Sequence, residues 1–103
     1  MINTMLVEDD LYIQKHFAER LESNGVFRLV GVYRDAFEAE KNCNGSIRLI
    51  LMDVQTQHKH SGLAAAERIK KAFPGIKIVV VMIIANVVAS LRTTSLSLKN
   101  VLE

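Results

Sequence analysis

The sequence lacks the features of a disulfide-stabilised or membrane-spanning protein. It has one cysteine, Cys43, so no disulfide can form within the chain, and we expect a reducing, cytoplasmic location. The apolar run at residues 78–85 is interrupted by Asn86 and is shorter than the roughly 18 to 20 apolar residues that a spanning helix requires. No charged-then-apolar signal sequence is found at the start of the sequence.

The composition indicates a single globular domain. Half of the 103 residues are apolar and 23% are charged, a balance that supports a folded core. The 13 lysines and arginines nearly balance the 11 aspartates and glutamates, and they are scattered along the chain. This distribution argues against a nucleic-acid-binding surface. We therefore expect one domain over residues 1–103, with no separate output domain.

Short β-rich runs alternate with helical ones along the chain. Strands are predicted at residues 2–7, 27–32, 47–52 and from 76 to about 84, and helices at residues 11–23, 36–42 and 63–73. The apolar faces of the first and third helices are expected to comprise Ile13, Phe17 and Leu21, and Leu63, Ala66, Ile69 and Phe73. This alternation predicts an α/β fold with a doubly wound parallel sheet, because parallel neighbours need crossover connections.

Acidic residues follow two of the predicted strands. Glu8 and Asp9 come directly after the first strand, and Asp53 comes directly after the third. In such sheets ligands bind beyond the carboxyl ends of the strands, so these side chains converge if the two strands are neighbours. Gathered carboxylates repel one another unless a cation lies among them, and oxygen ligands favour Mg²⁺. A magnesium ion would also neutralise a phosphoryl group under attack by one carboxylate.

A simpler interpretation assigns these acids to local structure. Asp9 and Asp10 can cap the first helix, a role worth about 0.5 to 1 kcal/mol, and Asp53 can be a turn residue. Taken singly, each acid fits either role. Their joint placement at strand ends favours the site.

Two segments of the sequence resemble the receiver domain of bacterial two-component response regulators. They are "MLVEDDLYIQKHFAERLESNGVFRLVG" and "IRLILMDVQTQHKHSGLAAAERIKKAFPGIKIVVV". They contain, in order, an acidic pair after the first strand, an aspartate after the third, a glycine opening the next helix and a proline before a β-branched strand. The resemblance covers residues 1–82 and implies a flavodoxin-like receiver fold. Residues 83–103 form a divergent tail.

The resemblance also implies a function and a set of site residues. Asp53 would be the phosphoacceptor, taking a phosphoryl group from a histidine kinase. Glu8 and Asp9 would hold Mg²⁺ together with Asp53 and the backbone carbonyl of Gln55, whereas Asp10 would cap a helix. The chain would then be a signalling phosphoacceptor rather than an enzyme.

The chain departs from the family pattern after Asp53. Gln57 replaces a proline, and Gly62 comes one residue later than usual. Met82 stands where a threonine or serine hydroxyl normally contacts the phosphoryl group, and a thioether cannot donate that hydrogen bond. The family lysine has a counterpart only in Lys99, which lies 17 positions after Met82, closer than the family spacing. We therefore expect a domain that switches poorly.

The tail admits two interpretations. Its apolar period of 3.6 favours a terminal helix with no fifth strand, whereas "SLSLK" can instead be a remnant of that strand. Without a fifth strand, the fourth would form a long β-branched sheet edge that pairs with other chains. We therefore predict a homodimer through the fourth strand or through the C-terminal segment.

Two other functions compete with the phosphoacceptor. The first is a pseudo-receiver, a dimerisation or interaction module that is not phosphorylated. The second is a small phosphohydrolase that uses Asp53 covalently, although Gln55 stands where such an enzyme would have a second aspartate.

Overall fold

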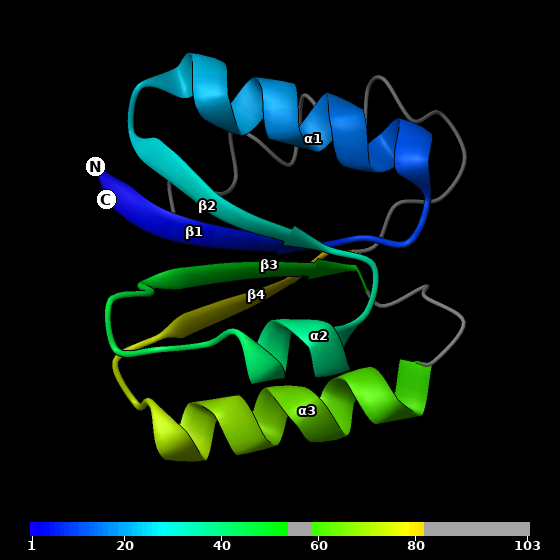
Figure 1. Cartoon of the computed structure of the whole chain (residues 1–103), viewed down its shortest axis with the longest axis vertical. Coiled ribbons are helices and arrows are strands. Elements are labelled where there is room, and N and C mark those ends of the chain that lie inside the picture. Colours follow the sequence, from blue (N-terminus) through cyan, green and yellow to red (C-terminus); the bar gives the residue numbers. More distant parts are fainter. Residues whose placement is uncertain (54–58, 82–103) are drawn as a thin grey trace.

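A parallel α/β sheet forms the centre of the computed structural model, which describes residues 1–53 and 59–81 (Figure 1). Its strands are β1 (Ile2–Val7), β2 (Phe27–Tyr33), β3 (Leu49–Asp53) and β4 (Lys77–Val81). Its helices are α1 (Leu11–Asn24), α2 (Ala36–Lys41) and α3 (Lys59–Ala72). The strand order is β2-β1-β3-β4, with every described pair parallel. The predicted α/β class and the parallel sheet are confirmed.

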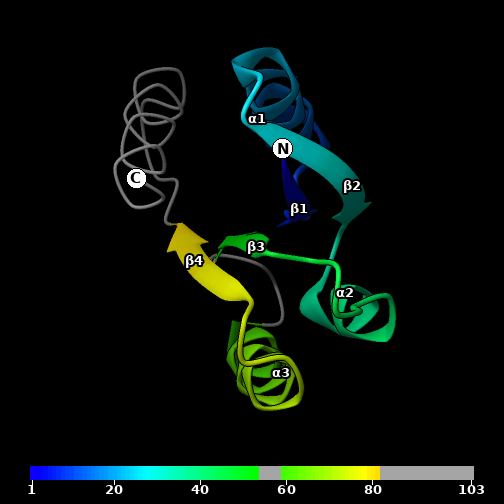
Figure 2. The same ribbon diagram turned by 90° about the vertical axis from the view of Figure 1, so that its left-hand side faces the viewer.

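Helices cover both faces of the sheet. Helix α1 lies on one face, and α2 and α3 lie on the other (Figures 1 and 2). Successive residues of a strand point to opposite faces, so Met5 and Val7 enter the core under α2 and α3, whereas Leu6 enters the core under α1. Two apolar cores require apolar side chains on both faces of the central strands, which explains the unbroken apolar runs at residues 5–7 of β1 and 49–52 of β3.

Capping residues mark the ends of α1 and the start of α2. The Asp10 carboxylate accepts two backbone N–H groups at the start of α1, and the Asp35 carboxylate accepts the N–H of Glu38 at the start of α2. Gly25 follows α1 with a φ of 80°, in the left-handed region that favours glycine. Each cap satisfies backbone groups that a helix end leaves unpaired.

Helix α3 differs most from the prediction. It begins at Lys59 rather than at residue 63, so Gly62 lies inside the helix and does not open it. A glycine inside a helix costs only about 0.5 to 1 kcal/mol, which tertiary packing readily offsets. Leu63, predicted to be in the core, is 44% exposed, while Ala65 is fully buried and Ile69 lies beside it in the core.

The strands differ from the prediction only at their ends. Strand β3 starts two residues later than predicted, at Leu49, and Asp53 is its last residue. Strand β4 starts one residue later than predicted, at Lys77, and its predicted continuation past Val81 lies outside the described residues. The predicted helical tail, the strand-five alternative and the expected C-terminal dimer segment also lie outside the described residues. Within the described ranges, no helix is long and apolar enough to cross a membrane.

Candidate functional site

The predicted site depends on whether β1 and β3 are neighbours, and they are. Val7 of β1 pairs with Met52 of β3, so the next residues, Glu8 and Asp53, follow side by side at the carboxyl ends of the two strands. The backbone N–H of Glu8 also donates to the carbonyl oxygen of Tyr33 at 2.9 Å, which continues the ladder toward β2. Main-chain contacts therefore hold Glu8 between β2 and β3, independently of its side chain.

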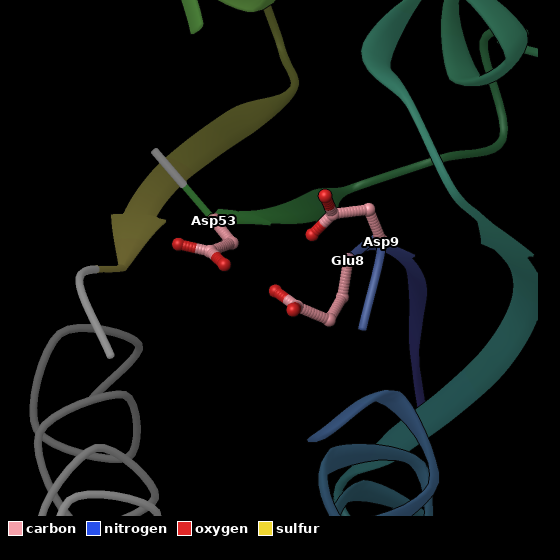
Figure 3. A group of neighbouring side chains, drawn as sticks. All are labelled: Glu8, Asp9 and Asp53. Atoms are coloured by element: carbon pink, nitrogen blue, oxygen red, sulfur yellow. The ribbon is translucent and has the colours of Figure 1, made fainter. Parts of the chain in front are cut away.

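Three carboxyl groups converge at this edge. One carboxylate oxygen from each of Glu8, Asp9 and Asp53 lies within 4.8 Å of the others. Figure 3 shows the three side chains directed into the same space between β3 and the turn that follows β1. Glu8 is 1% exposed and Asp53 is 8% exposed, whereas Asp9 is half-buried. The structure thus brings together the three acids that the sequence singles out.

The burial of these acids has an apolar cause. The hollow beneath them is lined by hydrophobic residues of three strands and α1: Leu6, Val7, Phe17, Leu51, Met52 and Val81. Water cannot solvate a carboxylate from that side, so burial disfavours its charged form.

In the turn between β1 and α1, Asp10 has a different role from Glu8 and Asp9. The Asp10 carboxylate caps α1 through Tyr12 N at 2.9 Å and Ile13 N at 3.0 Å, as predicted. The backbone N–H of Asp10 donates to Oε1 of Glu8 at 3.2 Å. The backbone N–H of Asp10 therefore helps to orient the Glu8 carboxyl group, while the Asp10 side chain caps α1.

Glu8 has a strongly perturbed pKa. The pKa of Glu8 is raised from 4.5 to about 9, first by burial and then by the hydrogen bond and negative charge of Asp53, while the backbone N–H of Asp10 opposes the shift. At neutral pH and without a cation, Glu8 therefore holds a proton next to Asp53. That proton relieves the repulsion between the two carboxyl groups.

The donor set suits a hard cation. All three side chains offer oxygen, the ligand type that Mg²⁺ prefers. The buried Oε2 of Glu8 accepts no hydrogen bond from the described residues, so its lone pairs are available to a proton or a metal ion. Glu8, Asp9 and Asp53 therefore fit a divalent cation that would replace the proton on Glu8.

Some predicted site residues lie outside the described part of the chain, and one contact was missed. Gln55, Met82 and Lys99 fall outside the described residues. Sequence reasoning overlooked Gln14, whose side-chain Nε2 donates to the carbonyl oxygen of Glu8 at 3.0 Å. The available signal was a long amide side chain in the first turn of a helix that directly follows an acidic strand end.

Comparison with known proteins identifies the fold. No protein-family model matches the chain. No curated protein matches it. Among solved structures, it is similar to RcsB, a response regulator of Salmonella typhimurium (TM-score 0.68, 18% identity), covering 89% of this chain and 48% of that one.

Isolated receiver domains are similar as well. The RcsB receiver domain of Salmonella enterica serovar Typhimurium, with the phosphomimetic BeF3-, has a TM-score of 0.68 and 18% identity over 89% of this chain and 70% of that chain. The BeF3-activated DrrB receiver domain has a TM-score of 0.64 and 19% identity over 84% and 69% of the two chains. The chain thus spans about half of a whole response regulator and has the fold of its receiver domain.

Proposed function

We propose that this chain, which has the fold of a response regulator receiver domain, accepts a phosphoryl group on Asp53 from a histidine kinase in the cytoplasm, with Mg²⁺ as cofactor. The observation that carries the proposal is the convergence of Glu8, Asp9 and Asp53 within 4.8 Å at the carboxyl end of the sheet. Parallel α/β sheets bind ligands at this end, and the chain places three oxygen donors there.

Each acid has a separate role in the proposed reaction. An oxygen of Asp53 forms a bond to phosphorus while the bond between phosphorus and the kinase histidine breaks, giving an acyl phosphate on Asp53 and a free histidine. Glu8 and Asp9 hold the cation, with the Gln55 carbonyl proposed as a further ligand. The bound Mg²⁺ supplies positive charge that offsets the phosphoryl oxygens. The chain acts here as a phosphoacceptor, changed once per transfer, and not as a turnover enzyme.

A direct phosphorylation experiment tests the proposal. The purified chain is incubated with acetyl phosphate and Mg²⁺, and its intact mass is measured. We expect one added phosphoryl group that disappears in Asp53→Ala and when Mg²⁺ is chelated. Glu22→Ala is the matched control, because it removes an exposed carboxylate in the last turn of α1, at the other end of that helix from the acidic turn, and should leave the adduct unchanged. A folded wild-type chain that gains no phosphoryl mass contradicts the proposal.

A second candidate is a pseudo-receiver that works only as an interaction module. The observation that favours it is the raised pKa of Glu8, because a bound proton allows the acidic cluster to remain neutralised without any metal. Such a module would show no phosphoryl adduct at any Mg²⁺ concentration while it retained its fold.

Homodimerisation through β4 is proposed for either function. Within the described sheet β4 is an outer strand, and its Val80 is 46% exposed. An outer strand of a sheet can pair with a strand of another chain. Light scattering over a range of concentrations tests this, and a monomer mass at every concentration contradicts it.

A further inference from the structure

Three hydrogen bonds fix Glu8 at the start of the turn that carries the acidic pair. Its N–H donates to Tyr33 O at 2.9 Å, its Oε1 accepts from Asp10 N at 3.2 Å, and its carbonyl oxygen accepts from Gln14 Nε2 at 3.0 Å. The first two depend on main-chain donors and acceptors outside Glu8. Of these three bonds, the one from Gln14 comes from a side chain, so it is the one that a substitution can remove.

The Glu8 carbonyl belongs to the peptide unit that joins Glu8 to Asp9. Because a peptide unit is planar and rigid, rotating it changes ψ of Glu8 and φ of Asp9 together. Those two angles set the directions in which the two carboxylates leave the main chain. A donor that holds this carbonyl therefore constrains both acids at once.

Gln14 is itself held firmly. Its backbone N–H donates to Asp10 O at 2.9 Å in the first turn of α1, and the Asp10 carboxylate caps the same turn. The side chain is half-buried between the helix and the turn. The capped helix and the acidic pair thus form one hydrogen-bonded unit with Gln14 as the link.

The chemistry of the link also suits a cation site. A glutamine amide donates to the carbonyl without adding positive charge, whereas a lysine or arginine at this position would compete electrostatically with a bound metal ion. We infer that Gln14 is a positioning residue for the acidic cluster, holding the Glu8–Asp9 peptide in the orientation that lets Glu8 and Asp9 bind a divalent cation. This inference rests on the proposed metal-dependent function of the site.

Gln14→Met tests the inference, because methionine keeps the length and helix propensity of glutamine but cannot donate a hydrogen bond. The matched control is Ser23→Ala, which removes another side-chain bond to a backbone carbonyl of the same helix, from Ser23 Oγ to Arg20 O, at its far end. For each protein, Mg²⁺ binding is measured by calorimetric titration, unfolding by urea, and amide exchange of Asp9 and Asp10 by NMR.

We expect Gln14→Met to weaken Mg²⁺ binding by about tenfold, the low end of the effect seen when outer partners of metal ligands are removed. Amide exchange at Asp9 and Asp10 should accelerate in Gln14→Met and not in Ser23→Ala. Unchanged Mg²⁺ affinity in Gln14→Met overturns the inference, even if its urea midpoint falls. If the wild-type chain binds Mg²⁺ but gains no phosphoryl group, only the phosphoacceptor function is overturned. If the wild-type chain binds no Mg²⁺, both the phosphoacceptor function and the inference about Gln14 are overturned.

Discussion

At the amino ends of the strands, basic side chains donate to backbone carbonyls, whereas at the carboxyl ends acidic side chains crowd together. Arg48 Nη1 donates to Gly45 O at 2.7 Å, and Lys70 Nζ donates to Ile76 O at 2.6 Å and Pro74 O at 3.1 Å. At the other end, Glu8 and Asp53 lie together in a largely apolar hollow.

The difference concerns charge balance. Arg48 and Lys70 are exposed, so water solvates their charges while they also donate to backbone carbonyls. At the carboxyl end, Glu8 is buried beside Asp53 and takes up a proton. The imbalance is therefore a buried pair of acidic groups at the carboxyl end of the sheet, and a proton on Glu8 reduces it.

Glu8→Gln should have the largest effect on the free energy of unfolding, because it removes one of the two buried acidic groups at the carboxyl end of the sheet. Between pH 4.5 and about 9 the folded chain keeps a proton on Glu8 that the unfolded chain has released. The stabilisation from that proton is complete below pH 4.5 and is lost as the pH rises toward 9. A glutamine amide has no such dependence and can donate to Asp53, so we expect Glu8→Gln to be more stable than wild type at pH 8 by about 1 to 4 kcal/mol.

Urea unfolding across this pH range measures the effect. Glu22→Gln, an exposed substitution of the same kind on α1, is the control and should leave the pH slope unchanged. If the free energy of unfolding of Glu8→Gln changes with pH as it does in the wild type, the proton on Glu8 is not the cause of that dependence.

Gly31→Ala tests how tightly the carboxyl end is packed. A Cβ at position 31 would lie 2.6 Å from the hydroxyl oxygen and 2.7 Å from a ring carbon of Tyr33, so the ring must move. We expect a loss of about 1 to 3 kcal/mol in the free energy of unfolding.

A double-mutant cycle with Tyr33→Ala identifies the cause. Once the ring is gone, adding Gly31→Ala should cost much less than it does in the wild type. If the losses in the free energy of unfolding from the two substitutions are strictly additive, the Tyr33 ring is not what makes Gly31→Ala unfavourable.

Removing Mg²⁺ should destabilise the wild type, because a cation bound to the folded state stabilises it by mass action. At a free Mg²⁺ concentration about five times its dissociation constant, the gain is about 1 kcal/mol. The gain should grow as the pH rises toward 9, since Mg²⁺ must displace the proton on Glu8. Thermal unfolding with Mg²⁺ and with a chelator measures this, and an equal response in Glu8→Gln would contradict the assignment of Glu8 as a ligand.

Lys70→Met tests the opposite end and should have the smallest effect. It removes the donor to Pro74 and Ile76 while keeping an unbranched side chain, so we expect a loss of about 0.5 to 1 kcal/mol and no change in Mg²⁺ affinity. Lys71→Met, at the exposed neighbouring position, is the matched control for charge. A marked change in Mg²⁺ affinity in Lys70→Met alone would show that the two ends are coupled.

Local signals predicted the elements and the capping residues well. The apolar period in α1 and the cap at Asp10 both depend on residues a few positions apart, and both are confirmed. Helix α3 was predicted less well, because Gly62 resembles a helix boundary. Packing against the sheet outweighs its weak preference and selects Ala65 and Ile69 for the core, leaving Leu63 exposed.

The sequence by itself determined that Glu8 and Asp9 follow the first strand and that Asp53 lies at the end of the third, and so which acids were available for a site. Only the tertiary structure decided that β1 lies next to β3, that Glu8 is buried beside Asp53, and that Gln14 reaches the Glu8 carbonyl. The physical reason is the separation along the sequence over which each effect acts. Periodicity and capping act over one or two turns of chain, whereas strand order, burial and the resulting pKa of Glu8 depend on contacts between segments far apart in the sequence.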